Sequence, residues 1–300
     1  RIPGSKLAIE RWQAGMSEGH RYLGIRGRAL LRSRSAGYSE HAEAIRQAHG
    51  KPRPSITLNQ NSMIHGTGID DLGALPAVIS EIEEADGCRI KAISFDIDGT
   101  LMDVTVVSKV LAEAAVIVLA RKGCRIEGDS GWSGAYHRVT EVIGRVRFGR
   151  WEDQIEIFQP TLPSGETITR DEAEEIVEKY NTNFDLALQT DRFVESLYPE
   201  TIRVLSDLHL RKVRLFIHSG RYTDLARRQL ASVGIHTEKE GGILSDICGG
   251  DRGDKVCQIR NHLRTAAVDH PGDFLVVGDT QDDIDAAIAN GTHSVRIEHW

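Results

Sequence analysis

From residue 90 onward, apolar and polar residues follow two different periods. Five short segments have the length and pattern of β-strands, at 90–95, 213–217, 243–247, 274–277 and 294–297. Amphipathic segments with a helical period lie between them, at 200–210, 222–233 and 255–265. Strands that alternate with helices in this way predict a largely parallel β-sheet with helices on both faces. The expected fold class is therefore α/β, with a Rossmann-like sheet.

A helical stretch interrupts this alternation. The helical period recurs in three segments, at 104–122, 135–146 and 170–188, and no strand pattern of comparable strength lies between them. We expect an inserted helical cap at 104–196. It divides the parallel-sheet core into 89–103 and 197–300.

Residues 1–88 are predicted to form an N-terminal extension, to which the pattern assigns no function. A short strand pattern lies at 55–58, and an apolar period at 75–84 predicts a helix that leads into the first core strand. The segment 65–71, HGTGIDD, mixes potential metal ligands with glycine, but no second ligand cluster follows at a recognisable spacing. We interpret 65–71 as a polar loop rather than as a metal site.

The charge of the chain narrows the classes of partner. A formal net charge of −7 argues against a general nucleic-acid-binding protein, because such proteins carry a dense excess of Lys and Arg. Residues 1–50 hold nine Lys or Arg against four Asp or Glu, which fits a basic arm but is more typical of a solvated extension. No apolar run reaches the roughly 18 residues that span a bilayer, so no membrane partner is expected. The sequence carries no signal of an oligomeric state.

The four cysteines are typical of reduced thiols rather than of a metal site or a set of disulfides. Cys88, Cys124, Cys248 and Cys257 show no CxxC spacing, so the sequence predicts neither a zinc site nor a dense disulfide framework. Reduced thiols favour a cytoplasmic location.

Polar clusters lie at the ends of the predicted strands or just beyond them. They are DIDGT at 96–100, HSG at 218–220, GDK at 253–255 and GDTQDD at 278–283. Ligands of open α/β sheets bind at the edge where the carboxyl ends of the strands meet, so we expect these clusters to lie together. Each cluster alone is a weak signal, whereas four in this order are specific.

The order and chemistry of the four clusters resemble the haloacid dehalogenase superfamily over about residues 90–300. The helical insertion lies where many members carry a helical cap, and the acid at position 98 points to the phosphatase branch. The resemblance implies a Mg²⁺-dependent enzyme that hydrolyses a phosphate monoester through an aspartyl-phosphate. It also implies that Asp96 and Asp279 bind Mg²⁺ with their side chains and Asp98 with its backbone carbonyl. Asp283 matches the second acid of the last motif, which ligates the metal or orders a ligating water or Lys255.

The residue types fit catalytic roles on chemical grounds. Asp96 can attack phosphorus and so divide hydrolysis into two easier steps. Asp98 lies on the same side of the chain, where it can protonate the leaving alcohol and then deprotonate the attacking water. Lys255 offers a positive charge to the nucleophile and to the transferring group. Because several carboxylates would repel a phosphate, the site needs a cation, and an all-oxygen cluster suits Mg²⁺.

A second set of groups is expected to hold the phosphoryl oxygens: Thr100, Ser219, Gly220 and Lys255. Ser219 is not interpreted as a nucleophile, because HSGR lacks the elbow and the histidine base that a catalytic serine needs. Asp103 is expected to be structural or to link the cap, and Asp282 to be solvated.

The partner is expected to be a small phosphorylated metabolite that the cap selects. Candidates to face it are Trp132, Tyr136, His137, Arg145, Arg147, Arg150 and Trp151. For any one of them, packing or a solvated surface is the favoured interpretation. Two alternatives stay open. One is a phosphosugar mutase, which also carries both aspartates, and the other is a non-catalytic binding protein that retains the core.

Overall fold

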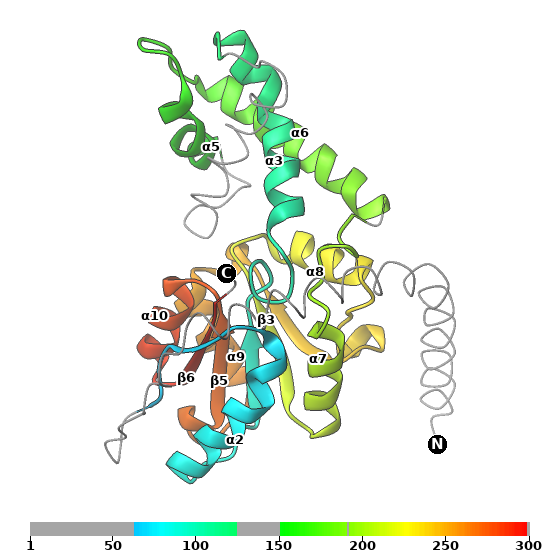
Figure 1. Cartoon of the computed structure of the whole chain (residues 1–300), viewed down its shortest axis with the longest axis vertical. Coiled ribbons are helices and arrows are strands. Elements are labelled where there is room, and N and C mark those ends of the chain that lie inside the picture. Colours follow the sequence, from blue (N-terminus) through cyan, green and yellow to red (C-terminus); the bar gives the residue numbers. More distant parts are fainter. Residues whose placement is uncertain (1–62, 125–150, 191, 299–300) are drawn as a thin grey trace, which may run out of the picture. The chain divides into compact units, whose positions relative to one another are not determined.

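The computed structural model describes residues 63–124, 151–190 and 192–298 (Figure 1). The predicted strand at 55–58 and the predicted helix at 135–146 lie outside these residues.

A six-stranded parallel sheet forms the core of the fold. In chain order its strands are β1 (Thr67–Ile69), β2 (Ala92–Phe95), β3 (Arg214–His218), β4 (Leu244–Cys248), β5 (Phe274–Gly278) and β6 (His293–Ile297). They lie in the order β1-β6-β5-β2-β3-β4, and every neighbouring pair is parallel. β2 therefore lies between β5 and β3, with Ala92 beside both Phe274 and Arg214. The predicted α/β fold with a Rossmann-like parallel sheet is confirmed.

β1 lies where the sequence predicts a polar loop, within the predicted extension of 1–88. Thr67 pairs with Val295 and Ile69 pairs with Ile297, so the sheet of the core already begins at residue 67. The polar-loop interpretation of 65–71 is thus wrong for these three residues. A strand this short, with a glycine at its centre, has too little apolar pattern to be recognised, and its pairing with β6 decides its conformation.

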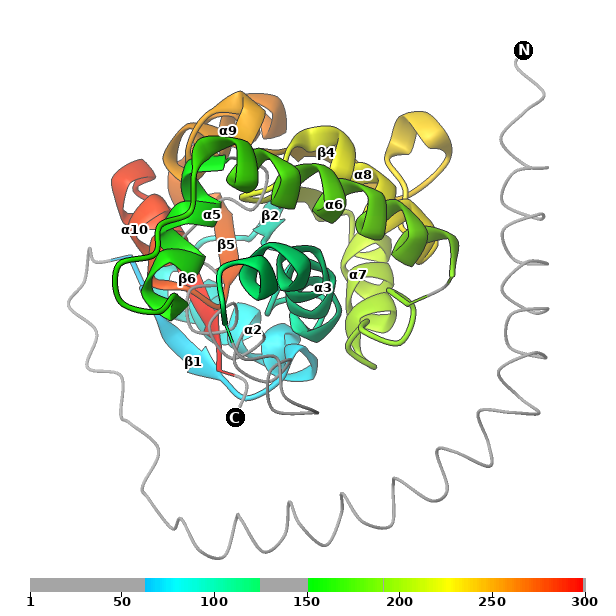
Figure 2. The same cartoon turned by 90° about the horizontal axis from the view of Figure 1, so that it is seen from above.

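Helices cover both faces of the sheet. One face carries α2 (Leu75–Asp86), α7 (Thr201–Leu210) and α8 (Thr223–Ser232), and the other carries α9 (Lys255–Ala266) and α10 (Gln281–Asn290). Ile93 and Phe95 of β2 pack in one apolar cluster with Leu205 of α7. Ala92 points the opposite way and packs with Ile259 of α9, as the alternation of side chains along a strand requires. Figure 2 shows α2 and α9 on opposite sides of the strands.

Two helices are absent from the sequence prediction, α10 and α5 (Trp151–Phe158). α10 has only two apolar residues larger than alanine, Ile284 and Ile288, and its start depends on a capping box in which Thr280 and Asp283 satisfy each other's backbone N–H groups. Single-turn 3₁₀ helices lie at Leu72–Ala74, Gln159–Thr161, Glu238–Glu240, Gly250–Arg252 and Pro271–Asp273.

The inserted segment contains α3 (Thr105–Arg121), α5 and α6 (Arg170–Gln189), which pack around an apolar cluster of their own. Phe184 lies at the centre of this cluster, with its ring 5.8 Å from that of Tyr180 and 5.0 Å from that of Phe193. Among the described helices, none combines the length and the apolar character that a membrane crossing requires.

The two connections between core and insertion run side by side. The backbone N–H of Asp103 donates to the carbonyl of Ser196 at 2.7 Å, and that of Tyr198 donates to Leu101 at 3.2 Å. The carboxylate of Asp103 accepts the backbone N–H of Thr105 at 2.7 Å, at the start of α3. This contact supports the structural role that the sequence suggests for Asp103.

Candidate active site

The site lies at the carboxyl ends of the central strands. Asp96, Ser219 and Asp279 each follow a strand directly, at the ends of β2, β3 and β5. Lys255 is the first residue of α9, and Asp283 lies in the first turn of α10. Because β2 is the neighbour of both β3 and β5, the loop that carries Asp96 lies between the other two loops.

The ammonium group of Lys255 joins two acids. Its Nζ lies 3.2 Å from Oδ2 of Asp96 and 2.6 Å from Oδ1 of Asp283. Burial alone would lower the pKa of Lys255, but Asp283 and Asp96 raise it above the ordinary value. Lys255 is therefore held as a cation against the carboxylate of Asp96.

All four lone-pair positions of the Asp283 carboxylate are used. Oδ1 accepts from Lys255 Nζ and, at 2.8 Å, from His218 Nε2. Oδ2 accepts from the backbone N–H of Thr280 at 3.1 Å and from its hydroxyl at 2.6 Å. Burial would raise the pKa of Asp283, but Lys255 and His218 lower it, so the group stays ionised. With every lone pair taken, this geometry favours the orienting of Lys255 over direct metal ligation by Asp283.

Asp96 and Asp279 carry negative charge that the described residues compensate only in part. Burial raises the pKa of Asp96 to about 7, with Lys255 opposing the shift and Asp283 and Asp98 adding to it. Burial likewise raises the pKa of Asp279 to about 8, with further contributions from Asp96 and Asp283. Oδ1 of Asp279 is buried and has no hydrogen-bond partner in the described part of the chain. A divalent cation would supply both the missing charge and the missing contact, so these residues fit Mg²⁺.

Close backbone approach brings Asp279 against the turn after β2. Gly99 has a φ of +76°, and a Cβ added there would overlap the carboxylate of Asp279. A Cβ added at Gly278 would overlap the carboxylate of Asp283 in the same way. The acids can therefore pack this closely only because these two positions carry no side chain.

Arg221 is a site residue that the sequence analysis misses. Its guanidinium pairs with Oδ2 of Asp98, and its Nη1 also donates to Oε1 of Gln229 at 3.1 Å. The guanidinium carbon lies 5.6 Å from the ring centre of Phe184 in α6, at the distance of a cation–π contact. The pair fixes the direction of the Asp98 carboxylate and brings a helix of the insertion into its surroundings. The only available signal in the sequence is that Arg221 directly follows the HSG motif.

Thr100, Ser219 and Gly220, which are expected to hold the phosphoryl oxygens, lie in the loops that follow β2 and β3 at the same edge of the sheet. Gln258 of α9 fixes the backbone of Ser219, accepting from its N–H at 2.9 Å and donating to its carbonyl at 3.1 Å. The Ser219 hydroxyl oxygen accepts the N–H of Arg221 at 3.1 Å, so its proton is available for a ligand. The buried hydroxyl of Thr100 has no partner among the described residues, and no heavy atom would lie within 4 Å of a Cβ at Gly220.

A buried row of hydrogen bonds leads from Asp283 along the face of the sheet that α9 covers. Nδ1 of His218 lies 2.8 Å from the hydroxyl of Ser94, and that hydroxyl lies 3.0 Å from Nδ1 of His262. None of these side chains is exposed.

The protons in this row can be assigned from its hydrogen bonds. The Asp283 carboxylate accepts, so His218 donates from Nε2, and burial lowers the pKa of His218 and keeps the ring neutral. Nδ1 of His218 then accepts the proton of Ser94, whose oxygen accepts from Nδ1 of His262. This assignment leaves Nε2 of His262 as an unprotonated nitrogen.

The cap candidates from the sequence lie outside the described residues, with one exception. Trp151 is half-buried, and Arg170 lies over its ring at 5.2 Å, which supports packing as its role. Asp282 is exposed, as expected for a solvated acid.

Comparison with known proteins gives one family. A family model described as haloacid dehalogenase-like hydrolase matches residues 90–291. No curated protein matches the chain.

Solved structures share the fold at low identity. CbbY from Rhodobacter sphaeroides, described in complex with phosphate, is 20% identical over 70% of this chain and 87% of its own, with a TM-score of 0.50. A haloacid dehalogenase-like family protein from Streptococcus pneumoniae is 22% identical over 70% and 85%, also at 0.50. A protein from Haemophilus somnus described as a predicted phosphoglycolate phosphatase is 19% identical over 69% and 84%, again at 0.50.

Proposed function

The chain belongs to the haloacid dehalogenase-like hydrolase family, and we propose that it hydrolyses a small-molecule phosphate monoester through an aspartyl-phosphate on Asp96. The contact between Lys255 and Asp96 carries this proposal, because a neighbouring cation favours the ionised form of a buried carboxylate, which is the nucleophile. Asp283 keeps Lys255 in that position through a second contact of 2.6 Å.

The first step transfers the phosphoryl group to the protein. An oxygen of Asp96 attacks phosphorus, and the bond from phosphorus to the ester oxygen breaks. Asp98 gives a proton to that oxygen, so the alcohol leaves in neutral form. Ser219 and Thr100 donate their hydroxyl protons to the phosphoryl oxygens, and Lys255 offsets the charge that develops on them.

The second step returns the enzyme to its starting state. Asp98, now ionised, takes a proton from water, and the water oxygen attacks phosphorus. The bond between phosphorus and Asp96 breaks, which frees inorganic phosphate. Mg²⁺, held by the side chains of Asp96 and Asp279 and the backbone carbonyl of Asp98, would neutralise the charge of the phosphoryl group when bound.

A similar structure and the surroundings of the site support the proposed substrate class. CbbY, which shares the fold, is described in complex with phosphate, and this supports a phosphorylated small molecule as the partner here. Phe184 brings the inserted helices close to the Arg221–Asp98 pair, so we propose that the cap covers the part of the substrate beyond the phosphoryl group.

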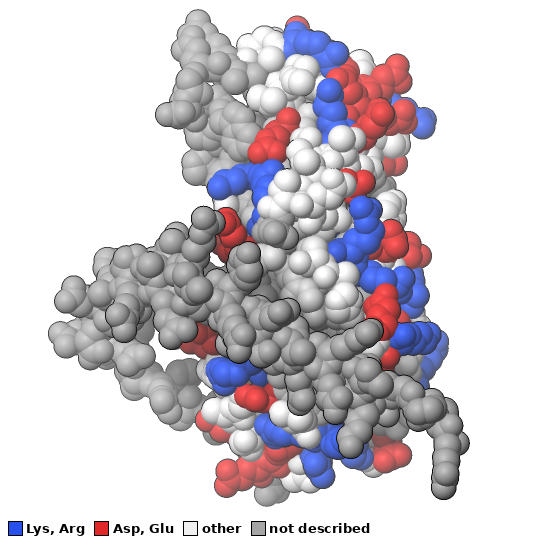
Figure 3. Space-filling view, turned by 90° about the vertical axis from the view of Figure 1, so that its right-hand side faces the viewer, with Lys and Arg blue, Asp and Glu red and all other residues white. Residues whose placement is uncertain are grey.

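On the face drawn in Figure 3, basic and acidic side chains alternate over the described residues, which does not favour a nucleic-acid partner. All four cysteines are free, and a cytoplasmic location stays a prediction.

Phosphate release from a panel of phosphate esters, with and without Mg²⁺, tests this function. We expect Mg²⁺-dependent release by the wild-type chain and none by Asp96→Asn, while circular dichroism shows both proteins folded. The same assay distinguishes a hydrolase from the two alternative functions. A mutase would isomerise a phosphosugar without releasing phosphate, and a non-catalytic binding protein would bind an ester without turnover.

A further inference from the structure

We propose that Asp246, Cys248 and His262 form a second metal site, which binds Zn²⁺ on the side of the sheet covered by α9. This site is separate from the acidic cluster around Asp96 and plays no part in the proposed reaction. The spacing of the cysteines predicts no zinc site, because only one cysteine takes part and the other two ligands are brought to it by the fold.

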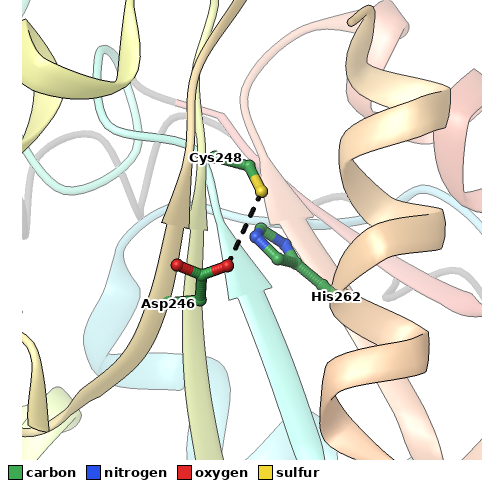
Figure 4. Close-up of side chains that lie close together, drawn as sticks. All are labelled: Asp246, Cys248 and His262. Carbon is green, nitrogen blue, oxygen red and sulfur yellow. Dashed lines mark hydrogen bonds between the residues drawn. The ribbon is translucent and has the colours of Figure 1, made fainter. Parts of the chain in front are cut away.

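The sheet and α9 place the three side chains together. Asp246 and Cys248 are two residues apart on β4, so their side chains point to the same face of the strand. His262 lies on α9, and its ring faces both of them (Figure 4). One potential ligand atom from each residue lies within 4.8 Å of those of the other two.

Nε2 of His262 supplies the independent sign of a ligand. His262 is fully buried, and Nε2 has no hydrogen-bond partner among the residues that the structure describes. Nδ1 of the same ring donates to Ser94, so Nε2 presents a lone pair toward the cluster. A histidine whose other ring nitrogen is fixed by a hydrogen bond is the usual form of a metal ligand in proteins.

The ligand types select the metal. A thiolate, an imidazole and a carboxylate suit Zn²⁺, whereas Mg²⁺ and Ca²⁺ prefer oxygen ligands alone. Sγ of Cys248 lies 3.9 Å from Oδ2 of Asp246, close to the separation of roughly 3.5 Å that tetrahedral Zn²⁺ with ordinary bond lengths requires. The Cys248 thiol gives its proton to solvent when the metal binds, and a water fills the fourth position. The side chain of Asp246 is 29% exposed, which gives an ion a path to the site.

Arg252 is the competing cation at this place. Its Nη1 lies 3.3 Å from Oδ2 of Asp246 and 3.7 Å from Sγ of Cys248. The Arg252 side chain is 42% exposed, so solvent weakens its ion pair with Asp246 and the guanidinium can turn into solvent at little cost. The metal therefore takes the position of the guanidinium, and removing Arg252 should strengthen metal binding.

Titration with Co²⁺ in excess Mg²⁺ tests this site in the full chain, because cobalt bound by a thiolate absorbs in the near ultraviolet. We expect one equivalent of Co²⁺ to give this band and Zn²⁺ to abolish it. Cys248→Ser should remove the band, and Asp246→Asn should weaken binding at least tenfold. Cys257 is a half-buried cysteine on α9, the helix that carries His262, and Cys257→Ser should change neither the band nor the affinity. Arg252→Ala should tighten binding severalfold.

The titration decides the proposal without relying on a single variant. If wild-type protein shows no charge-transfer band, or if Cys248→Ser keeps the band, the site does not exist. If Cys248→Ser does not fold, Arg252→Ala provides the second test, and unchanged or weaker binding in that variant contradicts the proposed position of the metal.

Discussion

The guanidinium of Arg221 is paired with the carboxylate of Asp98, with side chains only 5% and 18% exposed. Asp98 is the proposed proton donor and acceptor, and its other oxygen is buried without a hydrogen-bond partner among the described residues. By holding Oδ2, Arg221 fixes the direction in which Oδ1 of Asp98 points. Arg221 is therefore a positioning residue for Asp98.

Replacing Arg221 with Ala should lower kcat more than it changes KM. Because general acid–base catalysis contributes about 10²- to 10⁴-fold, partial loss of orientation should cost about 10- to 100-fold in kcat. Arg221→Lys should restore part of this loss, since it keeps the charge but not the fork of donors. Steady-state kinetics and the pH dependence of kcat check this.

Arg228→Ala is the matched control for Arg221. Arg228 also connects α8 to α6, through an ion pair with Asp185, but both side chains are more than 40% exposed. We expect kcat of Arg228→Ala close to that of wild type. Equal losses in the two variants would mean that Arg221 acts through general contacts with the insertion rather than through Asp98.

Asp283→Asn should destabilise the protein and reduce turnover together. The change removes one partner from the buried contacts with Lys255 and His218, and breaking a buried pair costs about 3–5 kcal/mol. Urea unfolding measures the loss, and phosphate release measures the turnover. Asp282→Asn, an exposed neighbour on the same helix, should leave the unfolding free energy within about 0.5 kcal/mol of wild type. If both variants are equally stable, the Asp283 contacts do not contribute as described.

Mg²⁺ should stabilise the protein more strongly at pH 8.5 than at pH 6.5. The pKa values of Asp96 and Asp279 are raised to about 7 and about 8, so the folded state binds more protons than the unfolded state above pH 4. Without metal, stability therefore falls as the pH rises through this window. Mg²⁺ binds the ionised acids and offsets the loss. Thermal unfolding with Mg²⁺ or with a chelator should show a difference in Tm that grows with pH, and a constant difference would contradict the proposed ligands.

Acid should destabilise the fold through the buried His262. Burial lowers the pKa of His262 to about 3, with His218 and Arg252 adding to the shift. The neutral ring is thus favoured in the folded state, and its contribution is complete above pH 6.5. It is lost as the pH falls below 6.5, at up to about 1.4 kcal/mol per pH unit. The unfolding free energy of His262→Gln should depend less on pH between 6.5 and 4.5, provided that urea unfolding shows it to be folded at pH 7.

Gly99→Ala should be more harmful than Gly87→Ala. Both glycines have positive φ, and the strain of a side chain there costs about 1–2 kcal/mol. Only at Gly99 would the new Cβ also overlap Asp279, because nothing lies within 4 Å of a Cβ at Gly87. Urea unfolding and Mg²⁺ affinity separate the two effects, and equal Mg²⁺ affinity in both variants would show that Gly99 is needed only for its backbone conformation.

The sequence predicts the sheet and the motifs because both depend on local patterns. The run at 274–277 is entirely apolar and that at 90–95 is mostly so, as expected for strands buried on both faces, and the structure forms β5 and β2 there. Asp96 and Asp279 could be proposed from their places after those strands. The glycine at position 99 is the one indication in the sequence that Asp279 packs closely against the turn after Asp96.

What the sequence misses depends on contacts between distant segments. β1 has three residues and is defined by its pairing with β6. Arg221 owes its role to Asp98, 123 positions earlier in the chain. Nε2 of His262 is left unprotonated because Nδ1 donates to Ser94, which lies 168 positions earlier in the chain. No periodicity or motif within one segment carries such information.

The most direct test of the central claim is to locate the phosphoryl group on the protein. Wild-type protein would be mixed with an ester that it hydrolyses in Mg²⁺, quenched in acid within one turnover, and digested for mass spectrometry. We predict one phosphoryl group on Asp96 and none in Asp96→Asn. A phosphoryl group on another residue, or Mg²⁺-dependent turnover that persists in Asp96→Asn, would contradict the account.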